Sequence, residues 1–163
     1  MGYVSVNQTR KVVTAIAAAC ALIAAITIAF AADKTASSIS AARLIQPSEL
    51  AALVKDSSVQ RPLMLHVGFR TMFDQAHIPG SEYAGPGNTA AGLQGLRKRV
   101  AELSNDTEIV LYCGCCPWIR CPNVAAALDI LQELGFSKTK AMYIADDFGT
   151  DWVDKGYPTA KSK

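Results

Sequence analysis

The chain has 163 residues, of which 18% are charged and half are apolar, and this length suits one ordinary domain with a short extension. Residues 1–32 carry only two charged side chains, both basic, and beyond them 14 basic residues balance 14 acidic ones. The balance excludes a nucleic-acid-binding protein, because such a protein needs a clustered excess of positive charge. The frequent apolar runs exclude a disordered chain.

The N-terminal segment has the pattern of an export signal. A basic pair precedes an apolar run over residues 12–32, and small side chains close the run, which is the order of a secretory signal. We therefore expect residues 1–31 to be a signal peptide cleaved before Ala32, residues 32–42 to be a linker, and the mature protein to be periplasmic or secreted. The alternative is an uncleaved anchor in the inner membrane with the domain facing the periplasm, because about 20 apolar residues span a bilayer.

From residue 43 to residue 163 the sequence alternates between strand-like and helix-like stretches. Apolar spacing predicts a helix that opens at Gln46–Glu49, a second over Thr89–Leu103 and a third that Pro122-Asn123 caps. Short apolar runs predict strands at Leu63–Val67, Glu108–Tyr112 and Ala141–Ala145. Shorter helical turns are expected at Thr71–Gln75 and from Asp151, and residues 81–88 are expected to form a loop. Strands separated by helices of this length predict an α/β fold, in which helices cover both faces of a central parallel sheet.

Four of the five cysteines lie within nine residues: Cys113, Cys115, Cys116 and Cys121. Cys113 follows a predicted buried strand directly, and the loop after it leads into a predicted helix. Ligands of open α/β sheets bind beyond the carboxyl ends of the strands, where loop amides and a helix N-terminus favour an anion and a thiolate. We therefore predict that Cys113 is a nucleophile that faces an anionic substrate, with Arg120 supplying positive charge.

Several motifs together resemble the rhodanese-like (sulfurtransferase) family over about residues 43–160. The matching segments are Gln46–Leu50, the strand Leu63–Val67, the FDQAHIPGS stretch Phe73–Ser81, the Tyr112-Cys113 unit, Asp151-Trp152, and Gly156–Pro158. The resemblance implies a rhodanese-like fold and an enzyme without a cofactor. It also implies that Cys113 takes sulfane sulfur as a persulfide, from thiosulfate or a persulfide donor, and passes it to a thiol acceptor that is a small molecule or a protein.

The active loop is expected to bind the small sulfur-containing anion. The candidate substrate-binding residues are Gly114, Cys115, Cys116, Trp118 and Arg120. The family's Asp-Val-Arg sequence after its second strand is replaced here by His66-Val67-Gly68. Arg120 lies seven residues after Cys113, whereas the oxyanion-handling loops of the superfamily have a C-x5-R spacing, so phosphatase activity is disfavoured.

The extra loop cysteines leave other functions open. Cys115, Cys116 and Cys121 are candidates for a resolving role or a disulfide, and disulfides are common outside the cytoplasm. A periplasmic thiol–disulfide module that uses Cys113 with one of them is one alternative. A non-catalytic metal- or thiol-binding domain is another, although cysteines confined to one loop fit a zinc site poorly, so no metal is predicted. Membrane contact is expected only through an uncleaved N-terminal segment.

Overall fold

The structure is a computed structural model that describes residues 39–162. The predicted signal peptide over residues 1–31 lies outside the described residues, as does the linker up to residue 38. The described residues belong to a compact unit that spans Ser37–Lys163. Within them, no helix is both long enough and apolar enough to cross a membrane.

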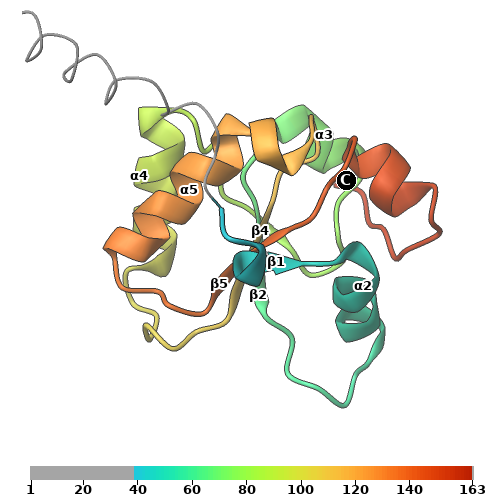
Figure 1. The fold of residues 1–163 in the computed structure, drawn as a ribbon, viewed down its shortest axis with the longest axis horizontal. Helices are drawn as coiled ribbons and strands as arrows, with labels where there is room; N and C mark the ends of the chain where they lie inside the picture. The colour runs from blue at the N-terminus through green and yellow to red at the C-terminus, as the bar shows by residue number, and fades with distance from the viewer. Residues whose placement is uncertain (1–38, 163) are drawn as a thin grey trace, which may run out of the picture. The chain divides into compact units, whose positions relative to one another are not determined.

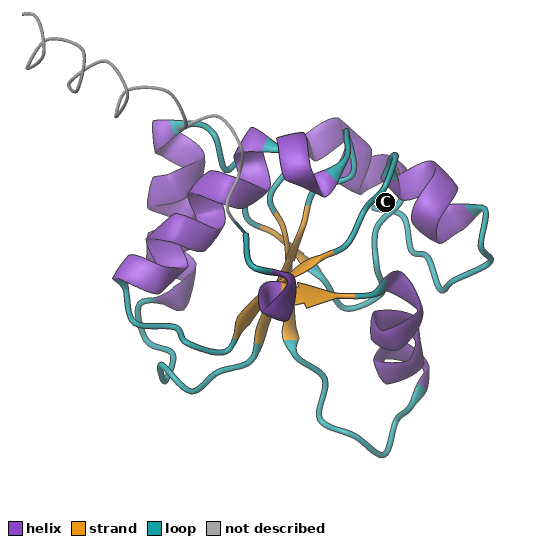
Figure 2. Ribbon diagram, in the orientation of Figure 1, coloured by secondary structure: helices purple, strands orange, loops and turns teal. Residues whose placement is uncertain are grey.

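A single five-stranded parallel sheet forms the centre of the described chain (Figure 2). In spatial order the strands are β1 (Leu44–Ile45), β5 (Thr139–Met142), β4 (Ile109–Tyr112), β2 (Leu63–His66) and β3 (Glu82–Tyr83). All strand pairs are parallel, and Leu65 of β2 lies opposite Leu111 of β4. The four residues of β4 are all buried, as expected for a central strand that helices cover on both sides.

Helices cover both faces of the sheet, which confirms the predicted α/β class. The helical elements are η1 (Ala41–Arg43), α2 (Pro47–Lys55), α3 (Arg70–Gln75), α4 (Ala90–Val100), η2 (Trp118–Arg120), α5 (Pro122–Glu133) and the π-helical turn η3 (Gly149–Val153). Figure 1 shows α4 and α5 side by side over one face, with α2 and η3 on the other side of the sheet. Because strand side chains alternate between faces, Leu65 and Leu111 pack in the core with α4 and α5. Met64 and Val110 pack in the core with α2 and η3.

Local sequence explains where the main helices begin and end. A capping box joins Gln46 and Glu49 at the start of α2, where Pro47 occupies the first turn. Thr89 caps α4 by accepting a hydrogen bond from the Gly92 amide. Beyond the end of α5, Gly135 has φ +89, a conformation that glycine adopts without the strain a side chain would cause.

The structure corrects three boundaries. The predicted loop over residues 81–88 contains β3, a two-residue strand too short to show any alternation of apolar side chains. The last strand begins at Thr139, before the predicted Ala141, because the pairing of Ile109 with Thr139 sets its register. The helix predicted over Thr89–Leu103 ends at Val100, and the turn that follows contains Leu103, whose amide donates to the Val100 carbonyl.

Candidate functional site

Cys113 lies at the carboxyl end of β4, directly after Tyr112, and its side chain is only 2% exposed. Its Sγ accepts a hydrogen bond from Nδ2 of Asn123, in the first turn of α5, at 3.6 Å. The orientation of that amide is fixed from the other side, because Asn123 Oδ1 accepts a hydrogen bond from the Asn88 amide at 3.1 Å. The fold therefore places a buried thiol between the end of a central strand and the start of a helix.

The loop holds three further thiols, and those of Cys115 and Cys121 lie close to this sulfur. Cys115 Sγ lies 3.3 Å from Cys113 Sγ and 3.4 Å from Cys116 Sγ. The Sγ atoms of Cys113, Cys115 and Cys121 all lie within 4.8 Å of one another. All four loop cysteines are free thiols in this structure. A resolving or disulfide role for Cys115, Cys116 and Cys121 therefore stays a prediction.

The neighbouring thiols hold their protons at neutral pH. Partial removal of its sulfur from water raises the pKa of Cys115 to about 11, and the same effect raises the pKa of Cys116. The pKa of Cys121 is raised by its interaction with the Cys113 sulfur and by burial. These thiols therefore remain neutral hydrogen-bond donors beside Cys113, able to stabilise negative charge on its sulfur.

A cleft of about 530 Å³ opens beside Cys113. Its walls come from the β2–α3 region, from the start of the cysteine loop and from the segment before and within η3. The lining residues are His66, Phe69, Met72, Gln75, Ala76, Cys113, Gly114, Cys115, Asp147, Phe148, Gly149 and Val153. This is the crevice expected beyond the carboxyl ends of parallel strands.

The first turn of the loop fits tightly against this cleft. Gly114 is buried and has φ +121, and its carbonyl accepts a hydrogen bond from the Phe148 amide at 3.1 Å. A Cβ at this position would lie 2.8 Å from Phe148 Cβ. Glycine is therefore required both for the backbone conformation and for the close approach of the two segments.

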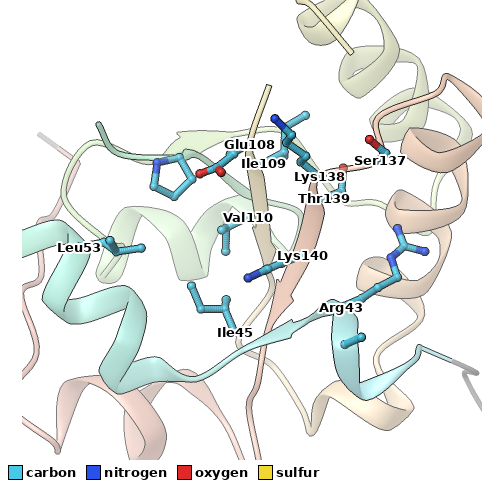
Figure 3. A pocket seen from close by; sticks show the side chains of 12 residues that line it. Arg43, Ile45, Leu53, Glu108, Ile109, Val110, Ser137, Lys138, Thr139 and Lys140 are labelled. Atoms are coloured by element: carbon cyan, nitrogen blue, oxygen red, sulfur yellow. The ribbon is translucent and has the colours of Figure 1, made fainter. Parts of the chain in front are cut away.

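A second pocket, of about 230 Å³, lies at the opposite edge of the sheet, by the amino ends of β4 and β5 (Figure 3). Arg43, Glu108, Lys138 and Lys140 contribute charged groups to it. None of the described residues that line it is a cysteine or a histidine. The candidate site is therefore assigned to the cysteine edge.

Comparison with known proteins identifies the fold. No protein-family model matches the sequence, and no curated protein matches it. Among solved structures, the Alr3790 protein from Anabaena sp. superposes with a TM-score of 0.56 at 17% identity, over 72% of this chain and 82% of that one. The single domain sulfurtransferase RDL2 of Saccharomyces cerevisiae superposes with a TM-score of 0.53 at 18% identity, over 73% of this chain and 94% of that one. A probable thiosulfate sulfurtransferase superposes with a TM-score of 0.50 at 24% identity, and the match covers 72% of this chain and 47% of that protein.

The chain has a rhodanese-like fold. This confirms the fold that the sequence motifs implied. At these identities the similarity establishes the fold alone. The activity of this rhodanese-like domain must therefore be inferred from the residues of its own site.

The rhodanese-like domain brings together some of the predicted site residues and separates others. Gly114 and Cys115 line the cleft with Cys113, and their binding of substrate stays a prediction. Cys116, Trp118 and Arg120 are not among the described residues that line it. The Trp118 amide donates to the Ile144 carbonyl at 2.9 Å, and its ring centroid lies 6.2 Å from that of Tyr143. Arg120 is exposed on η2, so substrate binding by these side chains stays a prediction.

Sequence reasoning missed most of the cleft wall. Phe69, Met72 and Gln75 follow β2, and Asp147 and Phe148 follow β5. These five residues share one signal, which is that each comes soon after the carboxyl end of a parallel strand. Residues in such positions meet at one edge of the sheet.

His66 occupies the position where the family motif has an acidic residue, and it is 1% exposed. Its ring packs against Tyr112, Phe73 and Tyr83, with centroid distances of 5.0, 5.5 and 6.1 Å. Its Nδ1 has no hydrogen-bond partner among the described residues. A Cβ on Gly68 would lie 2.8 Å from Cys113 Sγ and 2.9 Å from His66 Cε1, so the imidazole and the thiol border the same small space.

Burial lowers the pKa of His66 to about 4, from an ordinary value of 6.5. Between these two pH values the unfolded chain binds more protons than the folded one, so the free energy of unfolding rises with pH. We expect the protein to be most stable above pH 6.5 and to lose up to about 3 kcal/mol of its free energy of unfolding as the pH falls towards 4. Urea unfolding of the wild type and of His66→Gln across this range checks the prediction. An equally steep slope in His66→Gln would assign the pH dependence to other groups.

Proposed function

We propose that the domain is a sulfurtransferase that carries sulfane sulfur on Cys113. The observation that carries the proposal is the position of this buried thiol, which ends the central strand β4 and lines a cleft in a rhodanese-like fold. The cleft walls are apolar at Phe69, Met72 and Phe148, which suits a soft, weakly hydrated sulfur atom.

In the first half-reaction the Cys113 thiolate attacks the sulfane sulfur of thiosulfate. The sulfur–sulfur bond of thiosulfate breaks, sulfite leaves with the bonding electron pair, and Cys113 becomes a persulfide. In the second half-reaction the thiolate of an acceptor attacks the outer sulfur of this persulfide. The acceptor leaves as a persulfide, and the Cys113 thiolate is regenerated.

The loop supplies donors for the negative charge that both steps place on sulfur. The backbone N–H groups of Cys115 and Cys116 donate to no carbonyl in the described part of the chain, so they are free to bind an anion. The neutral thiol of Cys115 lies 3.3 Å from the nucleophile. Asn123 adds a neutral amide donor. Hydrogen bonds to a charged acceptor are stronger than those between neutral groups.

Export of the protein is a further part of the proposal. The basic pair and apolar run over residues 10–32 have the order of a signal peptide, which favours an exported, single-domain form in the periplasm or outside the cell. The donor would then be a small sulfur anion or a persulfide present there, and the acceptor a small thiol or a protein thiol.

Thiol–disulfide exchange is the second candidate, and the 3.3 Å separation of Cys113 Sγ and Cys115 Sγ favours it. Intact-mass analysis of the reduced protein separates the two functions. We expect a gain of one sulfur atom after thiosulfate, located on Cys113 by peptide mapping and removed by a small thiol. A loss of two hydrogen atoms with a mild oxidant, with no sulfur gained from thiosulfate, would instead establish the redox function.

A further inference from the structure

The cysteine cluster has dimensions that suit a bound metal ion. The Sγ atoms of Cys113, Cys115 and Cys121 lie within 4.8 Å of one another, and those of Cys113 and Cys115 are 3.3 Å apart. Metal–sulfur bonds of about 2.3 Å place ligand sulfurs roughly 3.8–4.0 Å apart in tetrahedral or trigonal geometry. The observed separations span this value, so small side-chain rotations bring all three sulfurs to one centre.

We propose that Cys113, Cys115 and Cys121 together bind one thiophilic metal ion, with Cu(I) preferred over Zn(II). Each ligating thiol releases its proton to solvent as the metal–sulfur bond forms. No oxidation or reduction is involved, because the ion enters as Cu(I). The same Cys113 sulfur would carry the sulfane sulfur, so the metal-bound and persulfidated forms exclude each other.

Two features of the fold suit the cluster to a bound metal ion. Cys121 is the N-cap residue of α5, where the positive end of the helix dipole offsets part of the negative charge that its sulfur acquires when a metal ion displaces the proton. Asn123 Nδ2 donates to the Cys113 sulfur, and its orientation is fixed by the Asn88 amide. Such outer donors orient a metal ligand and offset part of its charge.

The number and type of the ligands favour Cu(I). No histidine or carboxylate joins the three sulfurs among the described residues. Cys116 Sγ lies 3.4 Å from Cys115 Sγ, but Cys116 is not part of the group whose sulfurs all lie within 4.8 Å of one another. Soft thiolates bind both Cu(I) and Zn(II), but structural zinc sites are almost always completed by four protein ligands, so a group of three sulfurs favours Cu(I). Four cysteines in one short loop fit a zinc site poorly, and for that reason the sequence predicted no metal site. In the structure, η2 between Cys116 and Cys121 folds the loop back and brings the Cys121 sulfur close to the Cys113 sulfur.

The test is an anaerobic titration of the reduced, metal-free protein with Cu(I) in competition with bathocuproine disulfonate, and separately with Zn(II) against a chromophoric zinc chelator. We expect one Cu(I) per chain. Affinity should fall by at least about tenfold, the loss that even outer-shell partners of a metal site typically cause, in Cys115→Ser and in Cys121→Ser. Cys115 is exposed, so Cys115→Ser keeps the test decisive if Cys121→Ser disturbs α5.

The matched control is Cys116→Ser, which removes a thiol of the same loop outside the three-sulfur group and should retain Cu(I). Absence of Cu(I) retention against the chelator would overturn the proposal. So would equal losses in Cys116→Ser and Cys115→Ser, or tight Zn(II) binding that needs all four cysteines. Metal binding is measured directly here, so its outcome is independent of whether the protein transfers sulfur.

Discussion

Replacing Cys113 by serine should reduce sulfur transfer from thiosulfate to a thiol by about three orders of magnitude or more, as removal of a covalent nucleophile does in other enzymes. Serine preserves the size of the side chain at the end of β4, but its hydroxyl cannot form a persulfide. Steady-state assays of sulfite release, with thermal unfolding to check the fold, measure the loss.

The other loop cysteines provide a graded control for this prediction. Cys115→Ser removes a donor 3.3 Å from the nucleophile, and Cys116→Ser removes a thiol that lies outside the described cleft lining. We expect both variants to keep part of the rate, with the larger reduction in Cys115→Ser. Equal rates in Cys113→Ser and the wild type would rule out the persulfide mechanism.

Gly114→Ala should damage the site while leaving every reactive side chain in place. The residue has φ +121, and an added Cβ would lie 2.8 Å from Phe148 Cβ. Backbone strain of this kind costs about 1–3 kcal/mol, and the steric contact adds to it. The loop should relieve the clash by moving away from Phe148, which carries the Cys113 sulfur out of its position. We expect a loss of stability in urea and at least a tenfold loss in kcat/KM.

Gly95→Ala is the matched control, because it makes the same change on a helix. Gly95 lies in α4 with nothing within 4 Å of an added Cβ. Alanine in a helix interior is favoured over glycine by about 0.5–1 kcal/mol, so this variant should be slightly more stable and fully active. If both variants behaved alike, the close contact between Gly114 and Phe148 would have no role in holding the loop.

Local patterns were sufficient to place Cys113 at the end of a strand. The apolar run Glu108–Tyr112 predicted a buried strand, and the structure forms β4 over Ile109–Tyr112. Because a strand end is a well-defined point in an α/β sheet, placing Cys113 there followed from the sequence. The helix at Pro47 was also predicted correctly, since proline in the first turn marks a helix start, and the helix after the cysteine loop begins at Pro122, within the predicted Pro122-Asn123 cap.

The cleft and the sulfur cluster required the tertiary structure. Phe148 belongs to the wall because its ring packs against Trp152 and Tyr112, with centroid distances of 5.9 and 5.6 Å. No periodicity in the sequence reports such contacts between distant segments. Cys121 likewise reaches Cys113 only through the 3₁₀ turn at η2, a local bend for which apolar spacing gives no signal.

The strand order determines when the site can assemble during folding. The first strand pairs with the last, Leu44 opposite Ala141, and contacts so distant in sequence form late, because loop-closure entropy is lost before they stabilise the chain. The same late segment fixes the cysteine loop, through hydrogen bonds from the Trp118 amide to Ile144 and from the Phe148 amide to Gly114. A growing chain therefore exposes Cys113 and Cys121, the two thiols that are buried in the folded domain, before the C-terminal segment has formed. During that interval both thiols are open to oxidants and metal ions, and docking of the C-terminal segment ends this exposure.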